Sequence, residues 1–431
     1  MTDSTVAGHS ALPDQNALRL GVALLCLGGF CALALKQFWG IFAPDLSALY
    51  MAGHLFASGQ YDLIYAAPDT FFGGPPDEWL PLLSGIGLEG REVLPYVYPP
   101  LWAAVVAPIT EAVGPWAFFK AATVLEVATL VGCVFLSWRI CRKFAVPLWM
   151  WLLISTVLMA SSVIMFSALM HLQPQIIVLG LTMLAFERYS SGKHATAGAV
   201  LGLAAMLKLA PAGLALIFLL DRNWRALGVF TAVCAVLTGL NFAIAGPTLI
   251  QDFFDSMAHA SAGLFILAAA FSVEILVYGA ASAIDLVPPL DMDARNLLIG
   301  DSTMLVQLTT KALLLVSLGW AVVRTHRLPE SHQLATRLML FSLLINLFGP
   351  LNWVHYYLPQ LFLMPALIGF LPKPRGAALL IVIGVLTSWA LTVQLRQFFA
   401  GDFPFAAIGG ATMFGLFLAV LIAARPPAKA A

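Results

Sequence analysis

The sequence predicts an all-α integral membrane protein of about twelve transmembrane helices, with interfacial or re-entrant helices in two long extracytoplasmic loops. Three observations support this fold class. The 431 residues are 61% hydrophobic and only 10% charged, whereas soluble domains carry about 25% charged residues. Long apolar runs recur along the whole chain, and Lys and Arg residues collect in short clusters between them. We therefore expect residues 1–431 to form a single polytopic membrane domain.

A spanning helix needs about 20 apolar residues, and ten runs approach that length. They are 20–39, 115–138, 146–169, 174–186, 224–245, 302–323, 333–351, 356–371, 376–395 and 403–424. A further segment, 194–220, is interrupted near Lys208 and Pro211. We interpret it as two short helices, which brings the count to twelve. The first run also has features of a signal peptide, but its spanning length favours an uncleaved helix.

The basic clusters give the orientation, because Lys and Arg concentrate in cytoplasmic loops. With twelve crossings every cluster falls on one side of the membrane, so we expect that side and both termini to be cytoplasmic, in the cytoplasmic (inner) membrane. The clusters are Arg139 with Arg142 and Lys143, Arg188 with Lys193, Arg222 with Arg225, Arg324 with Arg327, Lys373 with Arg375, and Arg425 with Lys429.

Two long connections, 40–114 and 246–301, lie on the opposite side under this count, and both are acidic. Loops of this length usually have a function or helices of their own. Parts of them, such as 101–109 and 264–283, are apolar. We expect these parts to form helices that lie along the membrane face or dip into it. The working face of the protein is then extracytoplasmic.

The first of these loops carries an ordered set of residues. It contains DLSALYMAGHLFASGQYDLIY and, further on, YVYPPLWAAVVAPI, with Asp45, Tyr50, Ala52, Gly59, Tyr65, Tyr98, Pro99, Pro100 and Pro108. Later come Gln173, the small-residue run AGAVLGLAAMLKLAP with Lys208 and Pro211, the sequence Arg222-Asn223-Trp224-Arg225, and Asn352-Trp353-Val354-His355-Tyr356-Tyr357. In this order and spacing, the set resembles glycosyltransferase family 87, a group of clan C membrane enzymes that use polyprenyl-phosphate sugars.

The resemblance implies an integral membrane glycosyltransferase. It would transfer a hexose, with mannose as the first expectation, from a polyprenyl-phosphate carrier to the hydroxyl of a glycolipid or glycan acceptor on the extracytoplasmic face. Its partners would be this donor, the acceptor and the lipid bilayer. The resemblance implies no cofactor beyond the lipid-linked sugar itself.

Physical chemistry supports a catalytic role for Asp45. A hydroxyl attacks the anomeric carbon as the phosphate departs, and a carboxylate within reach can act as general base. Inversion in a single displacement needs only one such base. The departing phosphate is anionic, and cations or hydrogen-bond donors stabilise it. We expect His355 and Lys208 to bind it, and Tyr98, Gln173 and Asn352 to contact substrate.

Each of these residues also has a structural interpretation. Asp45 can cap a loop helix, His355 can belong to an interfacial aromatic belt, and Lys208 can extend its amine toward the interface. Tyr98 precedes a rigid Pro-Pro turn, while Gln173 and Asn352 can join helices by hydrogen bonds. His171, near Gln173, and the loop residues His54 and His259 are weaker candidates.

Other functions find less support in the sequence. The net charge is zero, which gives no electrostatic basis for nucleic-acid binding. Asp291-Met292-Asp293 has the form of a metal-binding DxD, but three residues occur often by chance, and we expect no metal site. The five cysteines form no CxxC pair or cluster with histidines, and we interpret them as small core residues.

Two alternative functions remain. A lipid-linked sugar flippase or transporter would also have many helices, some of them broken, but the two halves of the chain show no repeat. A ligase that transfers a preassembled glycan from a lipid pyrophosphate would need more cations in the loops than Arg91 and Arg295 supply.

Overall fold

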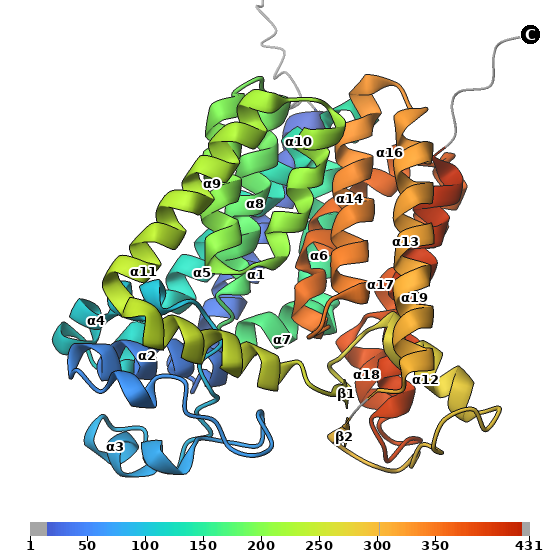
Figure 1. Cartoon of the computed structure of the whole chain (residues 1–431). Helices are drawn as coiled ribbons and strands as arrows, with labels where there is room; N and C mark the ends of the chain where they lie inside the picture. Colours follow the sequence, from blue (N-terminus) through green and yellow to red (C-terminus); the bar gives the residue numbers. More distant parts are fainter. Residues whose placement is uncertain (1–14, 301, 425–431) are drawn as a thin grey trace, which may run out of the picture.

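The protein is described by a computed structural model that covers residues 15–300 and 302–424. Long helices run side by side to form a bundle, and shorter helices and loops gather at one end of it (Figure 1). Both ends of the described chain lie at the other end of the bundle (Figure 1). The expected Arg425 and Lys429 cluster and the loop residue Asp301 lie outside the described residues.

Among the described residues, five helices are long and apolar enough to cross a membrane. They are α1 (Gln15–Phe38), α5 (Pro115–Ile140), α11 (Trp224–Ala260), α13 (Met304–His326) and α19 (Phe403–Ala423). At 1.5 Å per residue, a helix of 24 residues, such as α1, is about 36 Å long, enough for a hydrocarbon core of about 30 Å. These helices match five of the expected spans, and they make the chain a membrane protein.

The other expected spans consist of shorter or interrupted helices, so helix length alone does not establish twelve crossings, and that number stays a prediction. These elements are α6 (Leu148–Ser161), α7 (Val163–His171), α8 (Gln175–Ser190), α9 (His194–Leu207), η4 (Ala210–Ala215), α10 (Leu216–Leu220), α14 (Glu330–Phe348), η5 (Val354–Tyr357), α15 (Leu358–Leu363), η6 (Met364–Ala366), α16 (Leu367–Phe370), α17 (Lys373–Leu386) and α18 (Trp389–Leu395).

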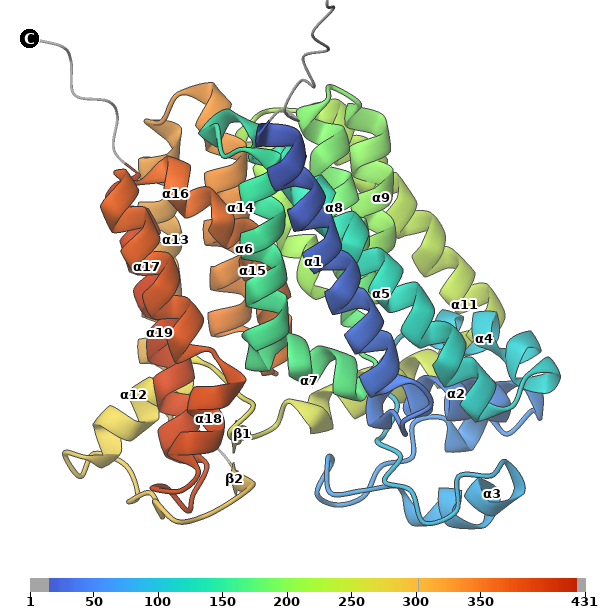
Figure 2. The ribbon, with the colours of Figure 1, turned by 180° about the vertical axis from the view of Figure 1, so that it is seen from behind.

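The apolar run 146–169 was expected to form one helix, and this expectation is wrong. The run breaks at Ser162, whose backbone is extended and whose Oγ accepts a hydrogen bond from the Ile164 amide. The Val163 amide donates to the carbonyl of Thr387, in the break between α17 and α18, at 2.9 Å. These contacts satisfy the first amides of α7, so this helix can start in a new direction at Ser162. After α7 the chain bends again, by 116°, into α8 (Figure 2).

The two long loops contain short helices, as expected. The first holds α2 (Pro44–Ala57), η1 (Tyr61–Leu63), η2 (Asp77–Trp79), α3 (Leu80–Gly85) and α4 (Pro100–Ala112). The second holds β1 (Leu264–Ile266), α12 (Val273–Ser282) and β2 (Leu297–Ile299), where the strands pair antiparallel. This small sheet is a departure from the all-α expectation. The remaining short helix, η3 (Arg142–Phe144), joins α5 to α6.

Helix α11 changes direction where the second loop was expected to begin. Gly246 has φ 71° and ψ 169°, outside the helical region, and Pro247 follows it. Glycine takes a positive φ without the steric cost of a Cβ, and proline cannot donate the helical hydrogen bond. The chain from Pro247 to Ala260 therefore runs across the end of the bundle (Figure 1).

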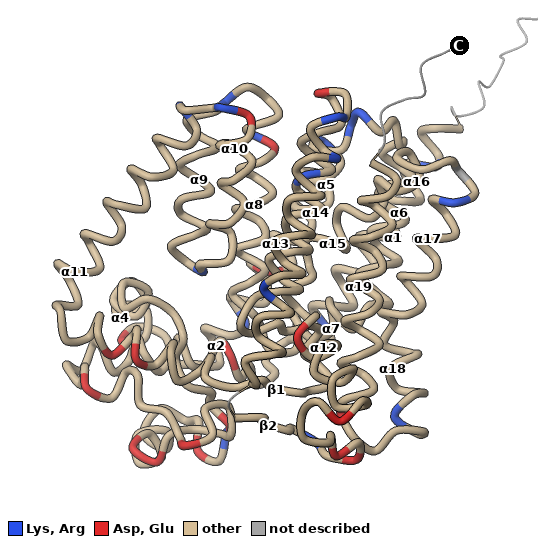
Figure 3. Tube along the Cα trace, turned by 45° about the vertical axis from the view of Figure 1, so that its right-hand side comes forward, with Lys and Arg blue, Asp and Glu red and all other residues tan. Residues whose placement is uncertain are grey.

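Charge divides the two ends of the bundle. Lys and Arg lie mostly around the turns at 141–147, 191–193, 221–223, 327–329 and 371–372, and we call this end the basic end. Asp and Glu lie mostly in 40–114 and 246–300, at what we call the acidic end (Figure 3). The separation agrees with the grouping of the basic clusters on one side in the sequence.

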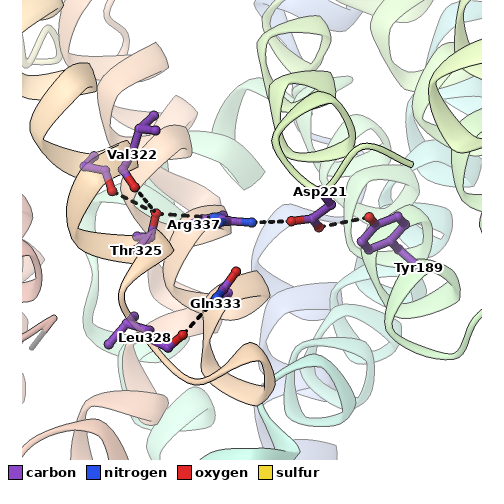
Figure 4. Close-up of polar contacts among 8 residues, drawn as sticks. Tyr189, Asp221, Val322, Thr325, Leu328, Gln333 and Arg337 are labelled. Carbon is purple, nitrogen blue, oxygen red and sulfur yellow. Dashed lines mark hydrogen bonds and ion pairs between the residues drawn. The ribbon is translucent and has the colours of Figure 1, made fainter. Parts of the chain in front are cut away.

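A polar network joins two parts of the chain at the basic end (Figure 4). Arg337 of α14, only 1% exposed, forms an ion pair with Asp221, which follows α10. The Tyr189 hydroxyl donates to Asp221 Oδ2 at 2.9 Å, and Arg337 Nε donates to Thr325 Oγ1 at 3.3 Å. The network therefore ties the end of the α9–α10 hairpin to α14.

Candidate active site

A cavity of about 110 Å³ lies at the acidic end, between the first loop, α7, the break after α9 and η5. Its lining residues come from segments far apart in the sequence. They are Asp45, Ala48, Phe72, Leu94, Pro95, Val97, Tyr98, Ser167, His171, Gln173, Lys208, Ala269, Leu351, Trp353, His355 and Tyr356. The cavity brings together five of the six residues that the sequence predicts for the site.

Asp45 lies in the first turn of α2, where Pro44 starts the helix. Its side chain is half-buried, and no described residue forms an ion pair with it within 4.0 Å. Burial raises the pKa of the Asp45 carboxyl, while the charges of His171 and Lys208 oppose this rise. Such a carboxylate faces the cavity without a permanent partner, and a raised pKa suits a general base near neutral pH.

Lys208 follows the last residue of α9 and has an extended backbone, with φ −153° and ψ 128°. Its Nζ lies 3.7 Å from the centre of the Tyr356 ring, a cation–π contact. Burial lowers the pKa of Lys208 to about 7, although the Asp45 carboxylate favours its charged form. The break in the helical hairpin, expected from the sequence, thus delivers a cation to the cavity.

Two histidines meet across the cavity. The rings of His171 and His355 lie 6.4 Å apart. His171 Nδ1 lies 2.8 Å from the Ser167 carbonyl, to which it donates. His355 is 4% exposed, and its Nε2 has no hydrogen-bond partner in the described chain. Burial, with the charges of Lys208 and His171, lowers the pKa of His355 well below its ordinary value.

Tyr98 and Gln173 complete the predicted part of the lining. The carbonyl of Tyr98 accepts a hydrogen bond from the Tyr65 hydroxyl at 2.7 Å. Burial first, and then the Asp45 charge, raise the pKa of the Tyr98 hydroxyl, which stays a donor. Gln173 is 3% exposed and its Oε1 has no partner among the described residues. Buried polar atoms usually have partners, so this amide has capacity left for a ligand.

Asn352 is the predicted residue that the cavity does not include. It lines an adjoining, mostly apolar cavity of about 320 Å³, to which Lys208, Tyr98 and Tyr356 also contribute. This second cavity lies between the end of α9, the crossing part of α11 and the end of α14, with Leu209, Phe253 and Ile345 in its walls. A polar cavity thus opens beside an apolar one, and Lys208 lies at both.

The sequence did not single out Phe72, indicated Trp353 only as part of the motif around His355, and gave His171 little weight, yet all three line the polar cavity. The Phe72 ring lies edge-on to Trp353 at 5.3 Å. Nothing in the local pattern around Phe72 marks it, because the contact joins residues 281 positions apart. The position of His171 close to Gln173 in the sequence indicated that it could belong to the site, but the direction of its side chain depends on the turn of α7.

The other two weaker candidates, His54 and His259, line neither cavity. The ring of His259 packs on Phe71 at 5.4 Å, and its Nε2 lies 3.3 Å from the Asp69 carbonyl. Asp291 and Asp293 are exposed and line neither cavity. In 15–300 and 302–424 no group of three or more His, Cys, Asp or Glu is arranged to hold a metal ion.

Comparison with known proteins identifies the family of the chain. A model of glycosyltransferase family 87 matches residues 96–351, more than half of the chain. The chain belongs to glycosyltransferase family 87. This membership makes it a membrane glycosyltransferase, as the ordered motifs indicated. The matched residues include Tyr98, Gln173 and Lys208, while Asp45, Asn352 and His355 lie outside them.

A curated protein is also similar to this chain. It is the polyprenol-phosphate-mannose-dependent alpha-(1-2)-phosphatidylinositol mannoside mannosyltransferase of Mycobacterium tuberculosis. The two sequences are 27% identical over 326 residues, which cover 70% of each chain. The similarity therefore extends over most of this family 87 chain.

Proposed function

We propose that this family 87 enzyme transfers a hexose, mannose in the first instance, from a polyprenyl phosphate to an acceptor hydroxyl. The observation that carries the proposal is the meeting of Asp45, Lys208 and His355 at one cavity, from three distant segments. The similar mannosyltransferase, whose name states dependence on polyprenol-phosphate-mannose, supports the choice of donor.

Asp45 acts as the general base in this proposal. It takes the proton of the acceptor hydroxyl while the oxygen attacks the anomeric carbon from the face opposite the phosphate. The bond from that carbon to the phosphate oxygen breaks in the same step, so the configuration inverts. The raised pKa of Asp45 makes its carboxylate a better proton acceptor than an exposed aspartate.

Lys208 and His355 receive the phosphate. The Lys208 amine, with a pKa of about 7, gains its proton when the anionic phosphate enters, because a neighbouring negative charge favours the ammonium form. His355 Nε2, buried and without a partner in the described chain, supplies a further contact. Gln173 and Tyr98 offer hydrogen bonds to sugar hydroxyls on the other walls.

The adjoining apolar cavity provides a place for the first isoprene units of the donor. It shares Lys208 with the polar cavity and has apolar walls. A carrier lying there would place its phosphate beside the lysine, at the junction of the two cavities, while Asn352 faces the lipid side. The acidic end is then extracytoplasmic, which agrees with the basic clusters at the opposite end.

A single-turnover assay tests the proposal. Purified protein in nanodiscs is mixed with radiolabelled polyprenyl-phosphate-mannose and a membrane lipid extract. We expect label in a new glycolipid or glycan with the wild type, and a loss of at least about a hundredfold with Asp45→Asn, as for removal of a general base. The matched control is Asp62→Asn, an exposed aspartate of the same loop, which should behave as the wild type.

Near-normal transfer by Asp45→Asn would refute the role of Asp45. If the wild type binds the labelled lipid but forms no product, while label crosses the membrane of sealed vesicles, the protein is a flippase instead. Transfer of a preassembled glycan from a lipid pyrophosphate, with no use of the monophosphate donor, would make it a ligase. Transfer unaffected by EDTA would agree with chemistry that needs no metal.

A further inference from the structure

A groove separate from the two cavities runs along the outside of the bundle. Its volume is about 660 Å³, and its walls come from α1, α6 and α7, with Trp389 of α18 at its edge. Figure 2 shows α1 crossing this side of the molecule beside α6 and above α7. Only 17% of the most apolar stretch of helix α1 is buried in the protein. In a membrane this side therefore faces lipid.

The length of the groove corresponds to one leaflet. Its lining on α1 extends from Cys26 to Phe38, which is about 18 Å along a helix. Half of a hydrocarbon core of about 30 Å is about 15 Å. Phe38 lies at the acidic end of α1, so the groove begins at that surface and reaches about the middle of the bilayer. An acyl chain that spans a single leaflet fits this length.

The groove has one charged residue, and it is a cation. Lys36 lines the groove near the acidic end of α1 and is exposed. No ion pair joins Lys36 to any other residue in the described part of the chain. No acidic residue lines the groove. Lysines at this depth extend to the interface, where the phosphates of lipid head groups lie.

Aromatic rings form the floor below Lys36. Phe166 of α7 lies 4.1 Å from Trp389 and 6.0 Å from Phe38, measured between ring centres. Flat apolar rings at the interface are typical of lipid contact. We propose that this groove binds one bilayer lipid with an anionic head group, its phosphate at Lys36 and an acyl chain along α1 and α6.

The groove and the catalytic cavity share one wall. On α7, Met165, Phe166 and Leu169 face the groove, whereas Ser167 and His171 face the cavity. These sets are separate sides of a single helix. A lipid in the groove therefore supports the helix that carries His171, without entering the polar cavity. The proposal concerns binding and does not depend on which sugar is transferred.

Native mass spectrometry of the purified full chain tests the proposal, using dioleoylphosphatidylglycerol and dioleoylphosphatidylcholine at equal concentration. We expect one retained lipid, with phosphatidylglycerol preferred. Lys36→Gln should lower this preference about fivefold, from the attraction of one lysine for an anionic surface. The matched control is Lys311→Gln, since Lys311 is also exposed on a spanning helix but lines neither this groove nor the cavities.

A second pair of variants tests the groove itself. Ala160→Phe fills it from an exposed position on α6, and retention of both lipids should fall. Val157→Phe, exposed on the same helix but outside the groove lining, should retain lipid as the wild type does. Equal retention and preference in Lys36→Gln, Ala160→Phe and the wild type would overturn the proposal. A wild-type dimer that Ala160→Phe dissociates would also overturn it, because a second copy would then occupy the groove.

Discussion

The pH dependence of transfer offers a direct test of the charge arrangement around Asp45. The charges of His171 and Lys208 hold down a pKa that burial raises. If Asp45 is the base, kcat/KM falls on the acid side as the free enzyme's Asp45 is protonated. Removing the cation in Lys208→Met raises the pKa of Asp45 further, so the acid limb should move to higher pH.

The size of this shift follows from the geometry. An opposite charge within about 4–6 Å lowers a carboxyl pKa by about 1–3 units. Asp45 and Lys208 form no ion pair within 4.0 Å, so the lower part of that range applies. We expect a shift of about one unit, equivalent to about 1.4 kcal/mol. Lys208 itself, with a pKa of about 7, should produce a basic limb that disappears in the variant.

The assay measures initial rates with polyprenyl-phosphate-mannose across the pH range, at donor concentrations below KM. Lys208→Arg keeps the charge and should leave the acid limb in place, and His171→Gln should move it in the same direction as Lys208→Met. We also expect the absolute rate to fall in Lys208→Met, because the proposed contact of Lys208 with the phosphate is lost. An acid limb that stays at the wild-type pH in both Lys208→Met and His171→Gln would refute this account.

Three further predictions concern packing, the basic end and metal. A Cβ at Gly198 would lie 2.1 Å from the carbonyl oxygen of Ala226. Gly198→Ala should therefore lower the free energy of unfolding in detergent by about 1–3 kcal/mol. Gly228 has open space around it, so Gly228→Ala should leave the stability unchanged. Arg337→Met leaves Asp221 without its cation and should cost about 1 kcal/mol, because the remaining carboxylate is accessible to water; the additional change Asp221→Asn should restore part of this, and full additivity would contradict the pairing. EDTA treatment should leave the transfer rate unchanged, and restoration of a lost rate by added Mn²⁺ would contradict this expectation.

The sequence predicted the parts of the site that depend on local signals. The first apolar run placed Asp45 just beyond the first span at the end of the bundle, and Lys208 with Pro211 predicted the break in the helical hairpin. The family resemblance, carried by the order of these residues, predicted the family to which the chain belongs. The catalytic and binding roles of the residues stay predictions.

Other parts depend on contacts between distant segments. The run 146–169 is apolar throughout, so no local feature indicates that it bends at Ser162. The bend is stabilised by Thr387, more than two hundred residues away. Likewise, β1 pairs with β2 across about thirty residues, and neither strand is long enough to show a period of two. Phe72 meets Trp353 for the same reason, through tertiary packing.

The ion pair between Arg337 and Asp221 has a mechanical consequence for the opposite end of the molecule. It fastens the turn after α10 to α14 at the basic end, while the chain around Lys208 and the far end of α14 form opposing walls of the apolar cavity. The segment from Lys208 to Asp221 and helix α14 are joined at the basic end, so they can move apart only at the acidic end. We therefore expect a long prenyl chain to enter the apolar cavity sideways at the acidic end, while the ion pair keeps the basic end of these elements together.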